Sequence, residues 1–286
     1  MTHVETGRRA TYGELLEVIH RLGIRPPETV SLKDPREFKI LGKPARRYEG
    51  AGKVDGSAPF GIAIKLADML SGAMARPPVY GGSVIDFDAT EALAMPGVVK
   101  AKAIRAGVVV LADSYWRAHK ARAKLKINWD RGANAAASTD QFYADYRALA
   151  DTPGMLAEDI GDAMGALDAA DEVVEATYEM PLLAHVTLEP MNCIAQVEGD
   201  TCTIWSGTQY QSNDQEVISR FLGIPQQNVT IHRPLMGGSF GRRSSKTADY
   251  TVEAVEAAMG ESVPVQIIWS REEDIRSGHY RPLFVH

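Results

Sequence analysis

The sequence has 286 residues, of which 45% are hydrophobic and 24% charged, and its formal net charge is −6. Such a composition is typical of a soluble globular protein with one large or two ordinary domains. The acidic balance argues against nucleic acid or an anionic membrane as the main partner, and no apolar run approaches the length of a membrane span.

The first predicted element is a helix that begins after Thr11. Thr11 and Glu14 match a capping box, and apolar residues recur at helical spacing up to Gly23. The segment 24–38 is rich in proline, so we expect a connector that continues neither as helix nor as strand.

Between about Lys39 and Asp130, short strands alternate with single helices, which predicts an α+β or α/β module; of the two fold classes we expect α+β. Residues 53–66 and 72–88 are predicted as strands separated by proline and glycine turns. The next predicted elements are a short helix at 89–97, two strands within 98–113, a helix capped by Ser114 and a strand at 127–130.

The second half begins with a stretch at 131–140 that is poor in large apolar residues and marks a domain boundary. Ser138 and Gln141 are expected to cap the next helix. Further predicted elements are strands at 172–180, 228–232 and 263–269, a hairpin of two strands at 193–205 with its turn at 198–200, a helix at 213–223 with a capping-box variant at Asn213 and Glu216, and a helix at 247–260.

A glycine-rich loop, "RPLMGGSFGRR", lies between a predicted strand and a predicted helix. Gly237, Gly238 and Gly241 would let backbone N–H groups approach an anion such as a phosphate. Arg242 and Arg243 would add charge-assisted hydrogen bonds to a diphosphate. The alternative is a turn in which glycine is present only because the backbone needs unusual φ angles, with both arginines in solvent. The local pattern alone slightly favours this alternative.

The same loop also matches G-x-S-x-G at Ser239, the nucleophile elbow of serine hydrolases. Pro234 would interrupt the elbow strand, and too little chain follows for the parallel strands of that fold. We therefore regard this match as a coincidence. The downstream acid and base candidates would be Asp249, Asp274, His279 and His286.

Three other stretches place polar residues at the ends of predicted strands. His185 and Glu189 are four residues apart beside a proline, and a buried polar pair is favoured over a metal site because no third ligand is in evidence. Gln209 lies in a loop, where sites are often built, although a lone glutamine is usually solvated. The charged run from Arg271 to Asp274 is predicted to be a solvated turn.

The two cysteines, Cys193 and Cys202, flank a predicted hairpin. A cross-strand disulfide is conceivable, but two inert buried thiols are favoured.

Taken in order, four segments resemble the molybdenum-binding large subunit of the xanthine dehydrogenase and aldehyde oxidase family, and most of all its isoquinoline 1-oxidoreductase beta-subunit type. They are "HVTLEP", "WSGTQ", "RPLMGGSFGRR" and "WSREEDIRSGHYRP". The resemblance begins near Ile40. It implies an α/β hammerhead domain at 39–131 and an incomplete first lobe of the molybdopterin-binding domain at 132–286, after an N-terminal helix and proline-rich connector at 1–38.

The resemblance also implies roles for single residues. Gln209 corresponds to the glutamine that hydrogen-bonds the apical ligand of molybdenum. The metal is held by the cofactor's dithiolene sulfurs, so no metal ligand from the protein is expected. The residues expected to cradle the cofactor, a molybdopterin cytosine dinucleotide in bacterial members, are Gly237, Gly238, Ser239, Phe240, Gly241 and Arg242.

The implied reaction is hydroxylation of an aldehyde or an N-heteroaromatic compound with oxygen from water. Electrons would leave through iron–sulfur clusters in a small [2Fe–2S] partner subunit, because this chain lacks the cysteines for them. Ser244 stands where purine-oxidising members have a substrate-binding glutamate, which argues against xanthine as the substrate.

One expected motif does not occur: the family's general base is a glutamate in a G-x-G-E sequence. We therefore expect either a fragment or one half of a split large subunit that is inactive without a separate C-terminal half. A non-catalytic scaffold is the alternative, and a serine hydrolase using Ser239 is least favoured. The sequence alone indicates a cytoplasmic chain, whereas an upstream twin-arginine signal would direct it to the periplasm.

Overall fold

The computed structural model describes residues 1–286, which form two compact units, Met1–Gly56 and Ser57–His286. The first unit contains the predicted helix, α1 (Tyr12–Leu22), with the capping box at Thr11 and a left-handed Gly23 at its end. No residue of this unit is buried, so it has no hydrophobic core of its own.

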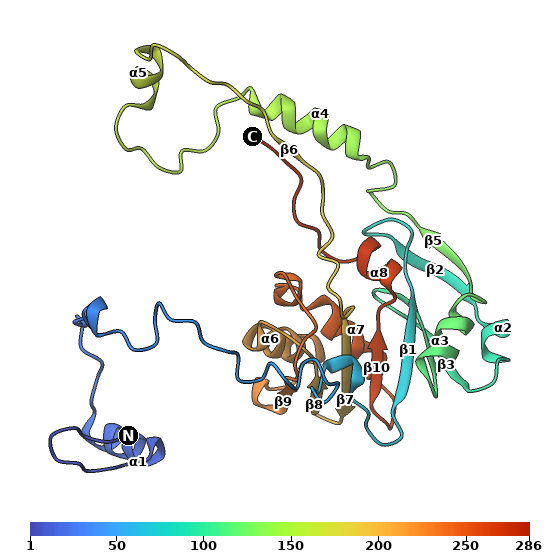
Figure 1. Ribbon diagram of the computed structural model, residues 1–286. Coiled ribbons are helices and arrows are strands. Elements are labelled where there is room, and N and C mark those ends of the chain that lie inside the picture. Colours follow the sequence, from blue (N-terminus) through green and yellow to red (C-terminus); the bar gives the residue numbers. More distant parts are fainter. The chain divides into compact units, whose positions relative to one another are not determined.

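The second unit is built on a seven-stranded mixed sheet with the order β3-β4-β1-β10-β7-β8-β9 (Figure 1). Two neighbouring pairs, β1 with β10 and β8 with β9, are parallel, and the other pairs are antiparallel. The strands are β1 (Leu70–Ala75), β3 (Val98–Ile104), β4 (Gly107–Ala112), β7 (Asn192–Glu198), β8 (Thr201–Trp205), β9 (Val229–His232) and β10 (Val265–Ile268).

The sheet joins strands from both halves of the sequence. Leu70 in β1 is opposite Val265 in β10, so strands from the region predicted as 39–131 pair directly with strands from 132–286. The two regions therefore share one sheet. Their division into a hammerhead domain and a cofactor-binding lobe stays a prediction.

Helices cover both faces of the sheet around the completely buried strand β4. Val109 and Leu111 belong to the core cluster that also contains residues of α7 (Asp249–Ala258), whereas Val110 packs with Ala121 of α3 (Tyr115–Arg122). Burial on both faces explains why β4 is a continuous apolar run rather than an alternating one. A further helix, α6 (Gln211–Leu222), packs against α7 and β9.

The remaining elements are short or lie away from the central sheet. Ser138 caps α4 as predicted by accepting a hydrogen bond from the Gln141 amide. None of the helices combines the length and the apolarity that a membrane-spanning segment requires. The remaining helices and strands are β2 (Ser83–Asp88), paired with β5 (Lys126–Asp130); α2 (Thr90–Leu93); α4 (Thr139–Ala150); α5 (Ala163–Asp168); β6 (Glu179–Met180), paired with β11 (Phe284–Val285); and α8 (Arg271–Arg276).

Three of the predicted strands and helices differ from the structure. Residues 53–66 form no strand; they contain a 3-10 turn, Gly61–Ala63, and a single bridge from Phe60 to Leu235, and the Ile62 amide donates to Glu189. Of the predicted strand at 172–180 only Glu179–Met180 is a strand, and Tyr178 before it exchanges two backbone hydrogen bonds with His286. Helix α6 starts before the predicted cap, and its N-cap residue Tyr210 makes no side-chain capping bond.

Candidate functional site

Three loops meet at one edge of the sheet because of the strand directions. β8 and β9 are parallel, so the loops that follow them, at 206–209 and 233–241, leave the sheet on the same side. β7 is antiparallel to β8, which brings the segment 187–190 before β7 to that same edge. The topology therefore gathers three of the four segments singled out in the sequence.

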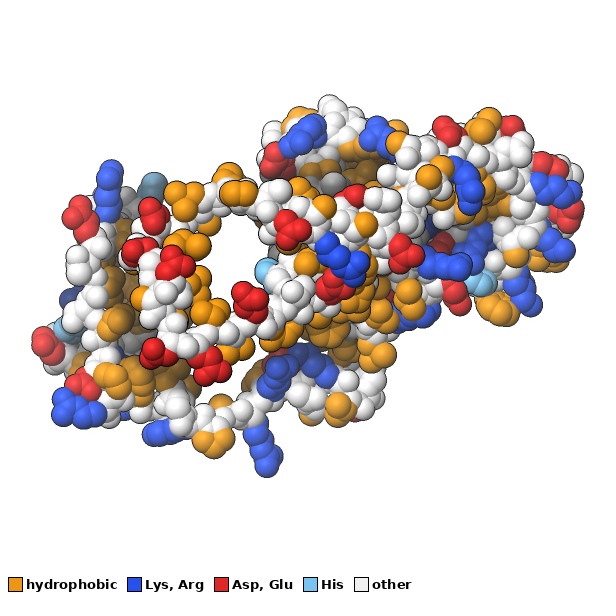
Figure 2. Space-filling model, turned by 90° about the horizontal axis from the view of Figure 1, so that it is seen from above, with side chains coloured by type: hydrophobic (Ala, Val, Ile, Leu, Met, Phe, Trp, Pro, Cys, Tyr) orange, Lys and Arg blue, Asp and Glu red, His pale blue; other side chains and the backbone are white.

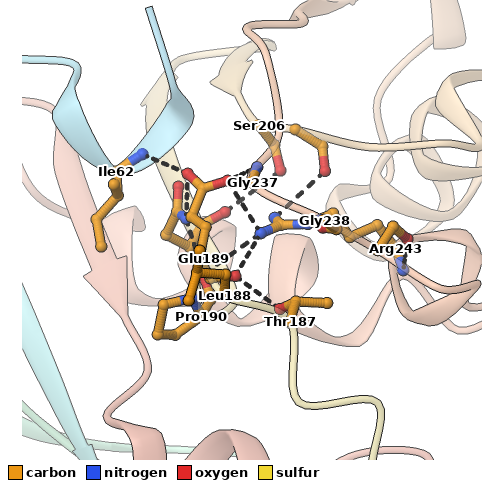
Figure 3. A network of polar contacts seen from close by, with 12 residues as sticks. Ile62, Thr187, Leu188, Glu189, Pro190, Ser206, Gly237, Gly238 and Arg243 are labelled. Carbon is orange, nitrogen blue, oxygen red and sulfur yellow. Dashed lines mark hydrogen bonds and ion pairs between the residues drawn. The ribbon is translucent and has the colours of Figure 1, made fainter. Parts of the chain in front are cut away.

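The carboxylate of Glu189 joins these loops (Figure 3). Its Oε1 accepts hydrogen bonds from the Ile62 amide at 2.8 Å and the Asn192 side chain at 3.1 Å. Its Oε2 accepts from the Gly237 amide at 2.5 Å and from Arg243 Nη2 at 3.2 Å. Glu189 is only 7% exposed, and these four donors satisfy a charge that would otherwise be costly to bury.

The guanidinium of Arg243 is completely buried and connects the same loops from the other side. It donates to the carbonyl oxygens of Gly238 at 2.9 Å, Gly207 at 3.3 Å and Glu189 at 2.9 Å. All its contacts are internal, so the expectation that it meets a diphosphate or solvent is wrong.

The guanidinium of Arg242 is also turned inward, although it was predicted to contact the cofactor. It makes a two-point ion pair with Asp249, at 3.0 and 2.6 Å, and its Cζ lies 5.2 Å from the ring centre of Trp269. Burial alone would raise the pKa of Asp249, but the ion pair with Arg242 lowers it below its usual value. The two arginines hold the loop in place from within.

The backbone of the glycine loop has the features of an anion-binding turn. Gly238, Phe240 and Gly241 have φ values of +99°, +53° and +97°, in the left-handed region that non-glycine residues rarely adopt. The amides of Gly238, Ser239, Phe240 and Gly241 donate to no acceptor within the chain. Successive unpaired N–H groups in such a turn form a concave site for an anion.

Gln209 is tied to this loop rather than free in solvent. Its backbone amide donates to the Arg243 carbonyl at 3.0 Å, and its side-chain Oε1 accepts a hydrogen bond from the Ser239 hydroxyl. The Ser239 oxygen in turn accepts from the Arg243 amide at 3.0 Å. The structure thus places the Gln209 side chain beside the glycine loop, while its contact with a molybdenum ligand stays a prediction.

The contacts of Ser239 do not support the serine hydrolase alternative. Its hydroxyl is engaged with Gln209 and Arg243, while His279 Nε2 contacts the Thr247 hydroxyl at 3.1 Å. Asp249, one candidate acid, is paired with Arg242. No histidine is therefore in place to activate the serine.

Other polar predictions have mixed outcomes. Glu189 is buried as expected, but its charged partner is Arg243 and not His185, whose pKa is lowered mainly by burial. Cys193 and Cys202 are free and buried, as favoured, and burial raises the pKa of both thiols.

The charged run predicted as a solvated turn is instead the capped helix α8. Ser270 and Glu273 form a capping box, and the Glu273 carboxylate is buried, 2.8 Å from Arg122. The nearby carboxylate of Glu253 accepts from Arg76 and from the Trp269 indole. This buried network was missed because sequence spacing does not show which distant charges will meet.

The chain matches known proteins over nearly its full length. Residues 148–286 match the molybdopterin cofactor-binding domain family. Isoquinoline 1-oxidoreductase subunit beta of Brevundimonas diminuta is 27% identical over 320 residues, covering 98% of this chain and 41% of that protein. Aldehyde oxidase 3 of Rattus norvegicus is 27% identical over 294 residues, covering 92% of this chain and 22% of that protein.

Solved structures show the same fold. Aldehyde oxidoreductase from Desulfovibrio gigas superimposes with a TM-score of 0.62 at 20% identity, over 83% of this chain and 31% of that one. Quinoline 2-oxidoreductase from Pseudomonas putida 86 gives 0.60 at 17% identity, over 80% of this chain and 34% of that one.

The chain spans about two fifths, or less, of the length of the curated relatives it matches. Residues 148–286 belong to the molybdopterin cofactor-binding domain family. The chain as a whole is similar to molybdopterin-binding subunits, among them isoquinoline 1-oxidoreductase subunit beta, an aldehyde oxidase and a probable xanthine dehydrogenase subunit.

Proposed function

We propose that this chain is part of the large subunit of a molybdenum hydroxylase and that its glycine loop holds an anionic molybdopterin. The observation that carries the proposal is the run of unpaired amides from Gly238 to Gly241 beside the anchored side chain of Gln209. The loop suits such a group, because its donors are unused and its φ angles are already set.

Bound there, the cofactor would supply the redox chemistry that hydroxylates an aldehyde or an N-heterocycle with oxygen from water. The chain's own residues bind and orient it. The loop amides donate to anionic atoms, and Gln209 Nε2, which has no acceptor within the chain, offers a further donor. Gly237 and Arg242 support the loop from behind rather than contacting the cofactor.

The proton acceptor for the reaction lies elsewhere in the proposed enzyme. Glu189 is the carboxylate nearest in the hydrogen-bond network, but both its oxygens are occupied by donors and it is paired with Arg243. A base engaged in this way is not available to take a proton. A glutamate from a C-terminal half of the large subunit would fill this role.

Exposed apolar side chains beside the site support a polypeptide partner. Leu188 is 90% exposed and Phe240 is 65% exposed. Hydrophobic side chains also gather on the face shown in Figure 2, and large exposed apolar patches often mark interfaces. The proposed partners are a C-terminal half of the large subunit and a small [2Fe–2S] subunit. We also propose that residues 39–131 are a hammerhead domain and that the cofactor is the cytosine dinucleotide form of molybdopterin.

The test is co-expression of this chain with a polypeptide corresponding to the rest of the large subunit and with the [2Fe–2S] subunit. We expect close to one molybdenum and one pterin per purified complex. In Gly241→Val, both should fall strongly, because valine is strained at φ +97° although its Cβ meets no atom of the chain. Gly154→Val, at a glycine with open space and no unusual φ, is the matched control.

Circular dichroism would verify that the valine variant keeps its fold. A wild-type complex that assembles without molybdenum would refute the proposal and leave the non-catalytic scaffold as the better account.

A further inference from the structure

One serine hydroxyl links the glycine loop to the side chain of Gln209. Ser239 is 5% exposed, and its oxygen accepts the Arg243 amide at 3.0 Å. A serine hydroxyl carries a single proton, and here that proton is directed to Gln209 Oε1. The order is therefore fixed as Arg243 N–H to Ser239 O–H to the Gln209 carbonyl.

This order decides which end of the carboxamide is free. A glutamine side chain has an accepting oxygen and a donating NH₂ group, and a half-turn exchanges them. With Oε1 taken by Ser239, Nε2 has no acceptor within the chain, and Gln209 is exposed. An incoming ligand therefore meets a donor.

We propose that Ser239 is a positioning residue, which holds the Gln209 carboxamide so that its NH₂ group faces the ligand. Building on the proposed function, this makes Gln209 a fixed donor to an electron-rich oxygen of the cofactor. A ligand group that can only donate, such as an ammonium, would find no acceptor at Nε2, so the arrangement favours a ligand oxygen with a free lone pair.

The restraint on Gln209 extends to its backbone. Arg243 accepts the Gln209 amide through its carbonyl at 3.0 Å and the Thr208 hydroxyl at 3.3 Å. The same arginine is locked by its buried ion pair with Glu189. The backbone and the side chain of Gln209 are thus both held by hydrogen bonds that lead to Arg243. This suits a side chain that must already be oriented before the ligand binds.

The first test needs no cofactor and uses the full chain. In ¹⁵N NMR spectra, the Gln209 NH₂ group, assigned by its loss in Gln209→Met, should show a high heteronuclear NOE despite its exposure. In Ser239→Ala the NOE should fall to the range of solvated glutamines. Ser239→Thr, which keeps the hydroxyl, should restore it, and Ser245→Ala, whose hydroxyl contacts Thr247 only, should leave it unchanged.

A wild-type Gln209 NH₂ as mobile as solvated glutamines would overturn the proposal, as would an NOE that is the same in the alanine variant. If Ser239→Ala does not fold, the wild-type chain and Ser239→Thr still test the proposal, because both should show a high NOE for the Gln209 NH₂ group.

The second test uses the assembled complex. Ser239→Ala should keep its molybdenum but lower kcat about tenfold, the effect of one misplaced hydrogen bond, with an altered Mo(V) EPR signal and an unchanged KM. An unchanged EPR signal and kcat would contradict the positioning role.

If the wild-type complex holds no molybdenum, the proposed function fails while the NMR result stands; if molybdenum is present but Gln209 is mobile, only the positioning role fails.

Discussion

Glycine at position 237 is required by packing and not by conformation. Its φ is ordinary, but a Cβ there would lie 2.5 Å from the Cβ of Glu189, closer than real Cβ contacts allow. The close approach lets the Gly237 amide reach the Glu189 carboxylate. The two neighbouring glycines differ, since Gly238 and Gly241 need their positive φ.

We therefore expect Gly237→Ala to destabilise the fold by about 1–3 kcal/mol, because either Glu189 or the loop must move. Urea unfolding would measure the loss, with Gly154→Ala as a control that has no neighbour within 4 Å. Equal stability of the two variants would show that the approach to Glu189 is not constraining.

Asp214 is a buried carboxyl group behind the Gln209 loop. It is 2% exposed and its Oδ2 has no hydrogen-bond partner. Burial is the main reason why its pKa is raised from 3.8 to about 6, and the charge of Asp249 adds to the effect. The folded chain therefore holds this proton more tightly than the unfolded chain does.

Because the folded pKa is raised, the contribution of Asp214 to stability is greatest below about pH 3.8 and is lost as the pH rises to about 6. Asp214→Asn cannot titrate, so its stability relative to wild type should improve by on the order of 1–3 kcal/mol between pH 4 and pH 7. Urea unfolding at a series of pH values measures this difference. A difference that does not change with pH would contradict the assignment.

At the scale of elements, the site depends on loops that one buried ion pair holds together. Glu189 precedes β7 and Arg243 follows the glycine loop, and their contacts also include Gly207 after β8. Removing one partner leaves an uncompensated buried charge, which costs more than the pair itself contributes.

Glu189→Gln and Arg243→Met should each lower stability by about 3–5 kcal/mol, and the double variant should lose clearly less than the sum. A double-mutant cycle would measure this coupling. The exposed pair Glu216–Arg220 on α6 is the control, with an expected coupling of about 0.5 kcal/mol or less. Additive losses at Glu189 and Arg243 would mean that the two do not act as a unit.

Elements with a clear local signal were predictable from sequence. The capping box and the terminal glycine identified α1, and the hairpin of β7 and β8 was also recognised in the sequence. Residues 53–66 were mispredicted because an apolar segment between turns has the sequence pattern of a strand, and that pattern does not show which group its backbone will bond to. Here the partner is the carboxylate of Glu189, far away in sequence.

At the scale of the whole molecule, the buried core lies in one unit. Every buried residue belongs to Ser57–His286, and none to Met1–Gly56. Because burial of apolar surface is the main stabilising term, a chain of residues 57–286 should keep the far-ultraviolet spectrum of the sheet and a Tm within a few degrees of the full chain. Loss of cooperative unfolding in the shortened chain would show that the first unit is needed.

The candidate site was predictable only in part. The ordered motifs placed Gln209 and Gly237 to Gly241 in one site, and the sheet topology brings them together. The roles of Arg242 and Arg243 were not predictable, because an arginine after a glycine turn can equally point to an anion or to a buried carboxylate. Both arginines point inward because each pairs with a carboxylate, Arg242 with Asp249 and Arg243 with Glu189.

The central claim is that the unpaired amides of Gly238 to Gly241 and the Gln209 side chain hold an anionic molybdopterin. An anomalous difference map at the molybdenum edge, from crystals of the assembled complex, tests it most directly. The account predicts one peak beside Gln209, with the cofactor's anionic atoms on the loop amides. A peak far from this loop, or loop amides paired with protein groups in the occupied complex, would contradict it.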